Sequence, residues 1–226
     1  MPELSTPTSG PAAGDRLRIT EIFHSLQGEA DTVGWPTVFV RLTGCPLRCH
    51  YCDTEYAFHG GEWMDLGAIL TEVGQYGARH VTVTGGEPLA QKACRPLLTR
   101  LCDAGYRVSL ETSGALDIDR IDPRVIKVVD LKTPGSGEVE RNRYCVLEHM
   151  SPDDQIKFVL CDRADYDWAR EKLTEYDIPA ICQVLFSPVW GRLAPRDLAD
   201  WILADRLPVR FQVQLHKLLW GDVPGR

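Results

Sequence analysis

The sequence predicts an α/β fold, a partial (incomplete) parallel β/α barrel trimmed of some helices. Short apolar, β-branched segments alternate with longer amphipathic ones, which is typical of strand–helix–strand units with right-handed crossovers. Two of the short segments, VTVT at residues 81–84 and VIKVV at 125–129, suit parallel strands that are covered on both faces. With 226 residues, the chain is too short for a full eightfold barrel with regular connections.

Eight segments have the apolar, β-branched composition expected of strands. They are residues 18–23, 37–42, 80–84, 107–111, 125–131, 156–160, 180–186 and 209–213. Two connections between them lack a helical pattern. Residues 112–124 are short and rich in turn residues, and residues 133–155 carry several Gly and Pro without a clear 3.6-residue period. These connections are the reason for expecting missing helices.

Four segments have the apolar spacing of amphipathic helices. They are residues 65–76, 89–104, 163–176 and 195–205. Asp65 and Asp162 stand where N-caps are expected, and Pro195 suits a first helical turn. Gly77 and Gly105 follow the first two helices and are expected to serve as C-terminal caps.

The composition indicates one soluble globular domain over residues 16–226, preceded by a flexible tail, residues 1–15, rich in Pro, Ser and Gly. A net charge of −7 argues against a broad basic surface, so no nucleic-acid or membrane partner is expected. The chain contains no apolar stretch of membrane-spanning length, and its start lacks the features of a secretory signal. We therefore expect a cytoplasmic protein.

Eight cysteines in such a compartment indicate metal ligands or buried thiols rather than disulfides. Cys45, Cys49 and Cys52 lie together in GCPLRCHYCDT, with the spacing C-x3-C-x2-C. This segment follows the predicted strand 37–42, so its loop belongs to the carboxyl edge of the sheet, where α/β proteins bind ligands. The other five cysteines are scattered, and most are expected to be inert buried thiols.

Three clustered thiolates favour a four-iron cluster that keeps one iron open to a substrate. A structural zinc ion needs four ligands, usually from two separate pairs, and His50 would be a strained fourth ligand. An ordinary [4Fe–4S] electron carrier uses four cysteines, so one would have to come from the scattered set. Both alternatives stay open on spacing alone.

The cysteine spacing resembles the signature of the radical S-adenosylmethionine superfamily, and Tyr51 matches its aromatic residue before the last cysteine. VTVTGGEP, residues 81–88, resembles the GGEP motif of the same superfamily. The resemblance implies a partial barrel of the radical SAM type and a [4Fe–4S] cluster on the three cysteines. It also implies that S-adenosylmethionine binds the open iron and is cleaved to a 5′-deoxyadenosyl radical.

Four further segments resemble one family within that superfamily, the 7-carboxy-7-deazaguanine synthases. They are EIFHSLQGEADTVGWPTVFVRLTGC at residues 21–45, CDT at 52–54, LETSG at 110–114 and QLHKLLWG at 214–221. The resemblance implies a lyase that converts 6-carboxy-5,6,7,8-tetrahydropterin to 7-carboxy-7-deazaguanine with release of ammonia, in queuosine-type 7-deazapurine biosynthesis. It further implies Mg²⁺, a flavodoxin- or ferredoxin-type reductant and a homodimer.

The same resemblance assigns roles to individual residues. The substrate-binding residues it implies are Leu26, Gln27, Gly28, Arg41 and Thr84. The S-adenosylmethionine contacts it implies are His50, Tyr51, Asp53, Gly86, Ser113, Lys132 and Gln183. Thr54 matches the Mg²⁺ ligand, which is reasonable because Mg²⁺ takes few protein ligands. A guanidinium such as that of Arg41 suits a substrate carboxylate, which it can bind at two points.

Some features are left undecided by the resemblance. Glu29 and Glu87 are possible polar partners, and the sequence does not show whether either is a base. QLHKLLWG could close the pterin pocket or only pack the last strand. Ala30 stands where the family has a glycine, which leaves the conformation of that loop open.

Two other functions compete with the synthase. A glycyl-radical-enzyme activase would share the cysteine loop but would not need SLQGE, Arg41 or Thr54. A non-catalytic iron–sulfur electron-transfer protein would give its cluster a fourth protein ligand, and its spectrum would not respond to S-adenosylmethionine.

Overall fold

A computed structural model describes residues 15–223 and residue 225. The tail expected at residues 1–15 lies outside the described residues apart from Asp15. The described part forms a nine-stranded sheet with the order β3-β1-β2-β4-β5-β6-β7-β8-β9. The strands are β1 (Arg16–Leu26), β2 (Pro36–Leu42), β3 (Glu62–Asp65), β4 (His80–Gly85), β5 (Arg107–Thr112), β6 (Ile126–Asp130), β7 (Gln155–Leu160), β8 (Gln183–Pro188) and β9 (Arg210–Phe211).

The sheet is mostly parallel. From β2 through β4 to β9 each strand pairs in parallel with the next, whereas β1 is antiparallel to β2 and β3 is antiparallel to β1. The two edge strands β3 and β9 do not pair with each other, so the barrel is open. The predicted α/β class and incomplete barrel are therefore confirmed.

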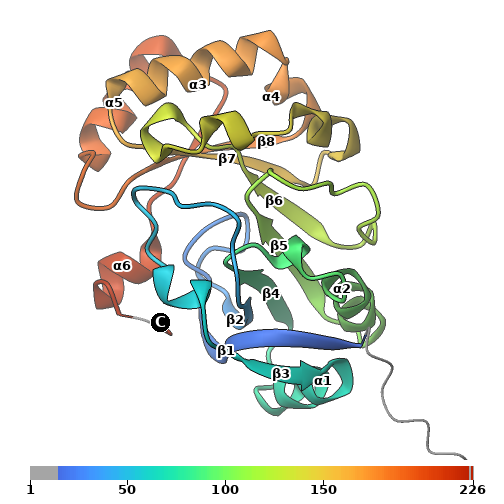
Figure 1. Cartoon of the computed structure of the whole chain (residues 1–226). Helices are drawn as coiled ribbons and strands as arrows, with labels where there is room; N and C mark the ends of the chain where they lie inside the picture. Colours follow the sequence, from blue (N-terminus) through green and yellow to red (C-terminus); the bar gives the residue numbers. More distant parts are fainter. Residues whose placement is uncertain (1–14, 224, 226) are drawn as a thin grey trace, which may run out of the picture.

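Six α-helices are present in the described residues, most of them on the outer side of the curved sheet (Figure 1). They are α1 (Leu66–Gln75), α2 (Cys94–Asp103), α3 (Arg163–Glu175), α4 (Ile178–Ile181), α5 (Pro195–Asp205) and α6 (Leu215–Trp220). The first five cover the outside of the sheet, and α6 lies near the open end of the barrel. No helix of the described residues is both long and apolar enough to cross a membrane.

The hydrophobic core lies between the sheet and these helices. Val40, Val83 and Leu110 on the strands pack with helix residues such as Leu97 and Tyr166 in one buried cluster. Because successive side chains of a strand point to opposite faces, the strand residues next to these core residues point into the barrel. Thr84, Glu111 and Lys157 are such inward residues, and they give the inner face a polar character.

The helix predictions are confirmed at three of four positions. The segments predicted at 163–176 and 195–205 form α3 and α5, and 65–76 forms α1. The Asp162 carboxylate caps α3 by accepting a hydrogen bond from the Asp165 N–H at 3.0 Å. Asp65 occupies the N-cap position of α1 but makes no side-chain capping bond. Gly77 and Gly105 adopt the left-handed conformation with φ of 64° and 88°, as a C-terminal cap requires.

The helix predicted at 89–104 is wrong at its start. Pro88–Ala90 form one 3₁₀ turn, and α2 begins only at Cys94. The physical reason is Pro96, which has no N–H and is tolerated in a first turn but not in a helix interior.

The other differences from the prediction concern short elements. The strand predicted at 180–186 starts late, because residues Ile178–Ile181 form the short helix α4 before β8 begins. The strand predicted at 209–213 is reduced to the two residues of β9. The short elements β3 and α6 were missed. The connections 112–124 and 133–155 contain no α-helix, as expected.

Candidate active site

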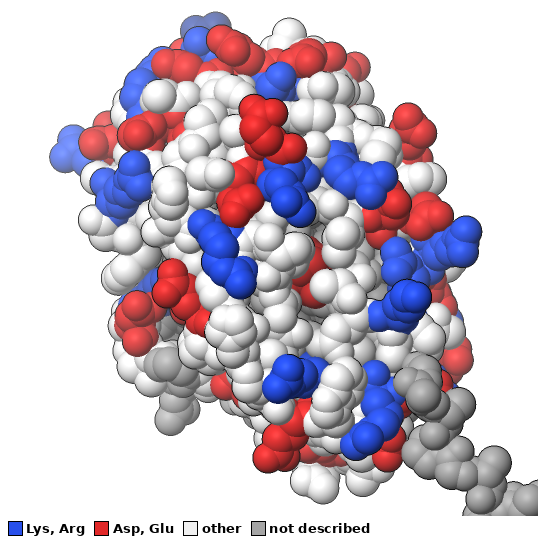
Figure 2. All heavy atoms as spheres, in the orientation of Figure 1, with Lys and Arg blue, Asp and Glu red and all other residues white. Residues whose placement is uncertain are grey.

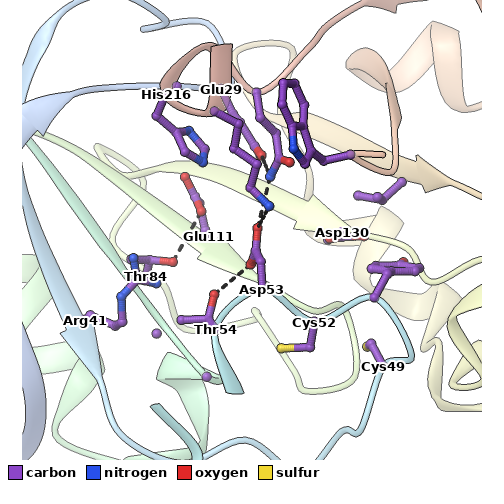
Figure 3. Close-up of a pocket in the computed structure, with 18 of the residues that line it drawn as sticks. Glu29, Arg41, Cys49, Cys52, Asp53, Thr54, Thr84, Glu111, Asp130 and His216 are labelled. Carbon is purple, nitrogen blue, oxygen red and sulfur yellow. Dashed lines mark hydrogen bonds and ion pairs between the residues drawn. The ribbon is translucent and has the colours of Figure 1, made fainter. Parts of the chain in front are cut away.

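The carboxyl ends of the parallel strands surround a cavity of about 540 Å³. Its wall combines the inner face of the strands, the cysteine loop that follows β2, and the C-terminal segment around α6. Figure 3 shows side chains from these three sources, including Glu111, Cys52 and His216, around one space. Basic and acidic side chains are intermixed on the face shown in Figure 2, where they form no continuous basic patch.

The cysteine loop is anchored by backbone hydrogen bonds to two neighbouring turns. The Glu87 N–H donates to the Gly44 carbonyl at 2.8 Å, and the His50 N–H donates to the Ser136 carbonyl at 2.9 Å. A Cβ on Gly86 would lie 2.3 Å from the Gly44 carbonyl oxygen, so only glycine permits this close approach. The GGEP turn and the cysteine loop are therefore packed backbone to backbone.

The three loop cysteines are partly buried free thiols that line the cavity. Burial raises the pKa of all three thiols, that of Cys49 to about 11. Burial thus favours the protonated thiol, whereas a bound metal favours the thiolate, because the thiolate is the form that it binds. No three His, Cys, Asp or Glu side chains of the described residues converge as ligands of a single metal ion. A four-iron cluster binds each cysteine to a different iron, so it does not require the three thiols to converge on one point.

Two buried polar atoms near the loop fit a further bound group. The Tyr51 hydroxyl and Asp130 Oδ1 are buried, and both lack a hydrogen-bond partner among the residues that the structure describes. Both residues line the cavity. Buried polar groups are normally satisfied, so these atoms point to a polar ligand or water beside the cysteine loop. Together with the three thiols, the pocket fits an iron–sulfur cluster and S-adenosylmethionine.

Glu87 links the GGEP turn to the end of β5. Its side chain is fully buried and accepts hydrogen bonds from the Thr112 hydroxyl at 2.9 Å and the Ser113 N–H at 2.7 Å. It also accepts from the Ser113 hydroxyl and the Leu89 N–H. With these four donors, the Glu87 side chain holds the GGEP turn and the end of β5 together.

The opposite wall holds a network of buried charged groups. Lys157 on β7 donates to Glu29 at 2.5 Å and lies 3.8 Å from Asp130 Oδ2, which also pairs with Lys132 at 2.9 Å. Glu111 accepts hydrogen bonds from Gln27 at 3.3 Å and Thr84 at 3.2 Å.

The pKa values of this network follow from burial and from Lys157. Burial alone would lower the pKa of Lys157, but Glu29, Asp130 and Glu111 outweigh it and raise the pKa, so the amine stays protonated. Burial alone would raise the pKa of Glu29, but Lys157 holds it below its usual value. For Glu111 burial prevails, and its pKa is raised.

Arg41 lies near the carboxyl end of β2, paired with Thr84 on the neighbouring strand β4. Its Nε donates to Glu21 Oε1 at 2.7 Å, and its guanidinium lies 5.8 Å from the ring centres of both Phe23 and Tyr56. Phe23, Arg41 and Tyr56 all line the cavity.

The C-terminal segment closes the cavity. The Gln214 amide donates to Glu29 at 2.8 Å and to Asp53 at 3.2 Å, and Lys217 pairs with Asp53 at 2.8 Å. A Cβ on Gly28 would lie 2.0 Å from His216 Nδ1, so the imidazole sits directly against this backbone. Of the two roles left open for QLHKLLWG, the structure selects closing the pocket.

Residues 39–129 match the sequence model of the Radical SAM superfamily. A 7-carboxy-7-deazaguanine synthase of Chlorobaculum tepidum is 46% identical over 91% of this chain and 94% of its own length. A protein of the same name from Koribacter versatilis is 42% identical over 90% of this chain and 97% of its own length. The chain belongs to the 7-carboxy-7-deazaguanine synthase family. The protein is therefore a radical S-adenosylmethionine enzyme with a [4Fe–4S] cluster.

Solved structures agree with this family. The crystal structure of QueE from Escherichia coli superimposes with a TM-score of 0.73 at 26% identity, covering 89% of this chain and 95% of that one. Streptococcus suis SuiB bound to S-adenosylmethionine, at 14% identity, shares the fold with a TM-score of 0.52, over 76% of this chain and 45% of that one.

All but one of the residues that the resemblance implied line the cavity. Those in the wall are Leu26, Gln27, Gly28, Arg41, Cys45, Cys49, His50, Tyr51, Cys52, Asp53, Thr54, Thr84, Gly86, Ser113 and Lys132. Gln183 is the exception, because it is exposed at the amino end of β8 and lines a different surface hollow. Parallel strands have their carboxyl ends at the cavity, so Gln183 lies at the wrong end of its strand. Ser187, near the carboxyl end of β8, lines the cavity instead.

Thr54 and Asp53 form a small polar pair at the edge of the cavity. The Thr54 hydroxyl donates to Asp53 Oδ1 at 2.8 Å (Figure 3). Burial would raise the pKa of Asp53, but Lys217 outweighs it and holds the pKa well below the usual range. The Mg²⁺ role of Thr54 stays a prediction.

Ala30 resolves the question about its loop. It adopts a left-handed conformation with φ of 63°, the conformation that a glycine would supply. Gln212 holds the strained residue in place, accepting from the Ala30 N–H at 2.7 Å and donating to the Ala30 carbonyl at 3.0 Å. The loop thus keeps its shape without the glycine.

Sequence reasoning missed several groups in the wall. They are Glu111, Asp130 and Lys157, whereas Gln214, His216 and Lys217 were expected only as part of QLHKLLWG, without individual roles. The first three are charged residues within otherwise apolar strands, VSLET, IKVVD and QIKFVL. A charge inside such a strand is costly unless it is paired, and this is the signal that could have marked them.

Proposed function

We propose that this enzyme converts 6-carboxy-5,6,7,8-tetrahydropterin to 7-carboxy-7-deazaguanine and ammonia. Substrate and product differ by the elements of one ammonia molecule, so the overall reaction needs no net oxidant or reductant. The observation that supports it best is that one cavity joins the cysteine loop to an arginine and to buried acid–base groups. The names of the relatives support the same substrate.

The cysteine loop would hold the reactive group. Cys45, Cys49 and Cys52 would bind the cluster, and Tyr51 and Gly86 lie beside them for contact with S-adenosylmethionine. When bound, the cluster and S-adenosylmethionine supply the radical that starts the reaction.

The protein side chains would fix the pterin along the inner face of the sheet. The guanidinium of Arg41 would bind the substrate carboxylate at two points, since its two terminal nitrogens face no hydrogen-bond acceptor among the described residues. Thr84 is paired with Arg41 in the parallel register of β2 and β4, and together with Gln27 and Glu111 it offers hydroxyl, amide and carboxyl groups to the polar edge of the ring.

Loss of ammonia and aromatisation require proton transfers. Lys157 stays protonated, because Glu29, Asp130 and Glu111 raise its pKa, so it would supply a fixed positive charge rather than a transferable proton. Burial lowers the pKa of His216, so its imidazole is neutral near pH 7 and could accept a proton. Of these two residues, His216 is the one that we assign to proton transfer.

Further features of the proposal rest on the resemblance. Mg²⁺ would bind Thr54 together with substrate oxygens. A flavodoxin- or ferredoxin-type protein would supply the electron, the enzyme would act as a homodimer, and it would work in the cytoplasm. The free thiols of the chain are compatible with a reducing compartment.

The test is an anaerobic assay of the reconstituted enzyme with S-adenosylmethionine, reductant, Mg²⁺ and 6-carboxytetrahydropterin. We expect a product lighter by one ammonia, detected by mass spectrometry, and no product from Cys52→Ala. Formation of 5′-deoxyadenosine without a pterin-derived product would reject the proposed substrate while leaving the superfamily assignment intact.

A further inference from the structure

We propose that Glu21 is a positioning residue for Arg41, and that it fixes the arginine in an end-on orientation that selects a carboxylated substrate. The inference rests on the proposed function, since it assumes that Arg41 binds the substrate carboxylate. Glu21 itself does not line the cavity, so it acts only through Arg41.

The contact between the two residues depends on an irregularity in the sheet. Ile19 lies opposite Leu42, and Glu21 lies opposite Arg41. Between these two pairs, β1 contains one residue that has no partner on β2. Thr20 is the extra residue of this bulge, and its hydroxyl is hydrogen-bonded to that of Thr43 at 2.8 Å.

The bulge decides which way Glu21 points. Side chains two residues apart share a face, so without the bulge Glu21 would lie on the face of Ile19, which packs in the hydrophobic core. The extra residue moves Glu21 to the face of Arg41. The next pair on that face, Phe23 and Phe39, stacks with ring centres 4.9 Å apart and lines the cavity.

The hydrogen-bond pattern fixes the orientation of the guanidinium. Glu21 Oε1 accepts from Arg41 Nε at 2.7 Å and from the Tyr56 hydroxyl at 2.8 Å. Arginine has five N–H donors, and this arrangement uses the single one on Nε. The four donors on the two terminal nitrogens stay available for an end-on, two-point contact with a carboxylate.

The surroundings restrict other orientations. The side chains of Arg41 and Glu21 are only 15% and 24% exposed, and the rings of Phe23 and Tyr56 lie beside the guanidinium. A preorganised donor loses less conformational entropy on binding than a mobile one. Glu21 should therefore increase the affinity for the carboxylate rather than for the pterin ring.

The test compares two pterins on the enzyme loaded with cluster and S-adenosylmethionine, without reductant, so that no turnover occurs. Isothermal titration would measure Kd for 6-carboxytetrahydropterin and for tetrahydropterin without the carboxylate. The readout is the ratio of the two Kd values, which a general loss of structure would not change selectively. Glu62→Gln is the matched control, because Glu62 is an exposed glutamate on β3 outside the cavity.

We expect Glu21→Ala to reduce the preference for the carboxylated pterin about tenfold, the scale of one charge-assisted hydrogen bond. Kd for the pterin that lacks the carboxylate should stay unchanged. Glu21→Gln keeps the shape of the side chain and should give a smaller loss, which covers the case that the alanine variant does not fold. In an Arg41→Ala background, Glu21→Gln should have no further effect on the preference.

The inference is overturned if Arg41→Ala abolishes the preference while both Glu21 variants keep it. It is also overturned if the effects of Glu21→Gln and Arg41→Ala are additive. A wild-type enzyme with no preference for the carboxylate would instead reject the substrate-binding role of Arg41, and with it the basis of the inference. The outcomes therefore separate this inference from the proposed function.

Discussion

Glu29 and Lys157 form an ion pair in the wall of the cavity, although 128 residues separate them in the sequence. Their side chains are only 12% and 11% exposed. The pair connects the loop after β1 to strand β7, and Gln214 from the C-terminal segment donates to the same glutamate at 2.8 Å. It therefore joins three distant parts of the chain around the active site.

Lys157→Met should strongly destabilise the enzyme, because it leaves Glu29 buried without its cation. Removing one partner of a buried pair typically costs about 3–5 kcal/mol. The double variant Lys157→Met/Glu29→Gln should recover much of this loss, since no unpaired charge remains at Glu29. Urea denaturation followed by circular dichroism measures the free energy of unfolding of both variants. A double variant that is less stable than Lys157→Met alone would contradict the pairing.

The same pair should make stability depend on pH in the acid range. The pKa of Glu29 is lowered from its model-compound value of 4.5, so the unfolded state binds a proton first as the pH falls. The stabilisation by Glu29 is present above pH 4.5 and is lost as the pH falls through the lower pKa of the folded state. Lys157, His216 and the carboxyl of Glu111 are the other ionisable groups that face it.

The measurement is the free energy of unfolding of the wild type and of Glu29→Gln between pH 3 and pH 7. The difference between the two proteins should shrink as the pH falls below 4.5. A difference that is constant over this range would mean that the pKa of Glu29 is not lowered in the folded enzyme.

Each loop cysteine should be essential for the cluster. Cys49→Ala should lose the iron and the visible absorption of the reconstituted protein, because only three protein thiolates are available to the cluster. Cys145→Ala is the matched control, since Cys145 is an exposed free cysteine elsewhere in the chain. Iron and sulfide analysis measures the cluster content of both variants. Full cluster content in Cys49→Ala would contradict the assigned ligand set.

Gly86→Ala should destabilise the contact between the GGEP turn and the cysteine loop. The new Cβ would meet the Gly44 carbonyl oxygen at 2.3 Å, and backbone cannot move aside as a flexible side chain can. We expect a loss of about 1–3 kcal/mol, the usual cost of overpacking, together with weaker binding of S-adenosylmethionine. Gly67→Ala, with nothing within 4 Å of its Cβ, is the control and should be neutral or slightly stabilising. Equal melting temperatures for Gly86→Ala and the wild type would show that the loop adapts.

The local parts of the site could be predicted from the sequence. The cysteine loop and the GGEP turn come after strands whose apolar pattern is clear, and Arg41 lies near the end of one of them, so their place at the carboxyl edge of the sheet was predictable. The short elements were less accessible. The helix α6 has six residues and β3 has four, which is too short for a periodic pattern to be recognised.

The non-local parts could not be predicted in the same way. The direction of Glu21 depends on one extra residue in β1, which is visible only in the pairing with β2. Gln183 was assigned by resemblance alone, and it proves to be the first residue of β8, because Ile178–Ile181 form a helical turn before that strand. Predicting the pairing of Glu29 with Lys157 requires the full strand order, because the sequence around each residue does not indicate which residue lies opposite it.

The most direct test of the proposed function is the stoichiometry of a single anaerobic reaction with the reconstituted enzyme. Ammonia, 7-carboxy-7-deazaguanine and remaining S-adenosylmethionine would be quantified over many turnovers with 6-carboxytetrahydropterin. Because the overall reaction needs no net oxidant or reductant, the hydrogen atom taken by the radical can be returned and S-adenosylmethionine re-formed. The proposal therefore predicts one ammonia per deazaguanine formed, with S-adenosylmethionine largely conserved. Consumption of one S-adenosylmethionine per turnover, or ammonia release without the deazaguanine, would contradict it.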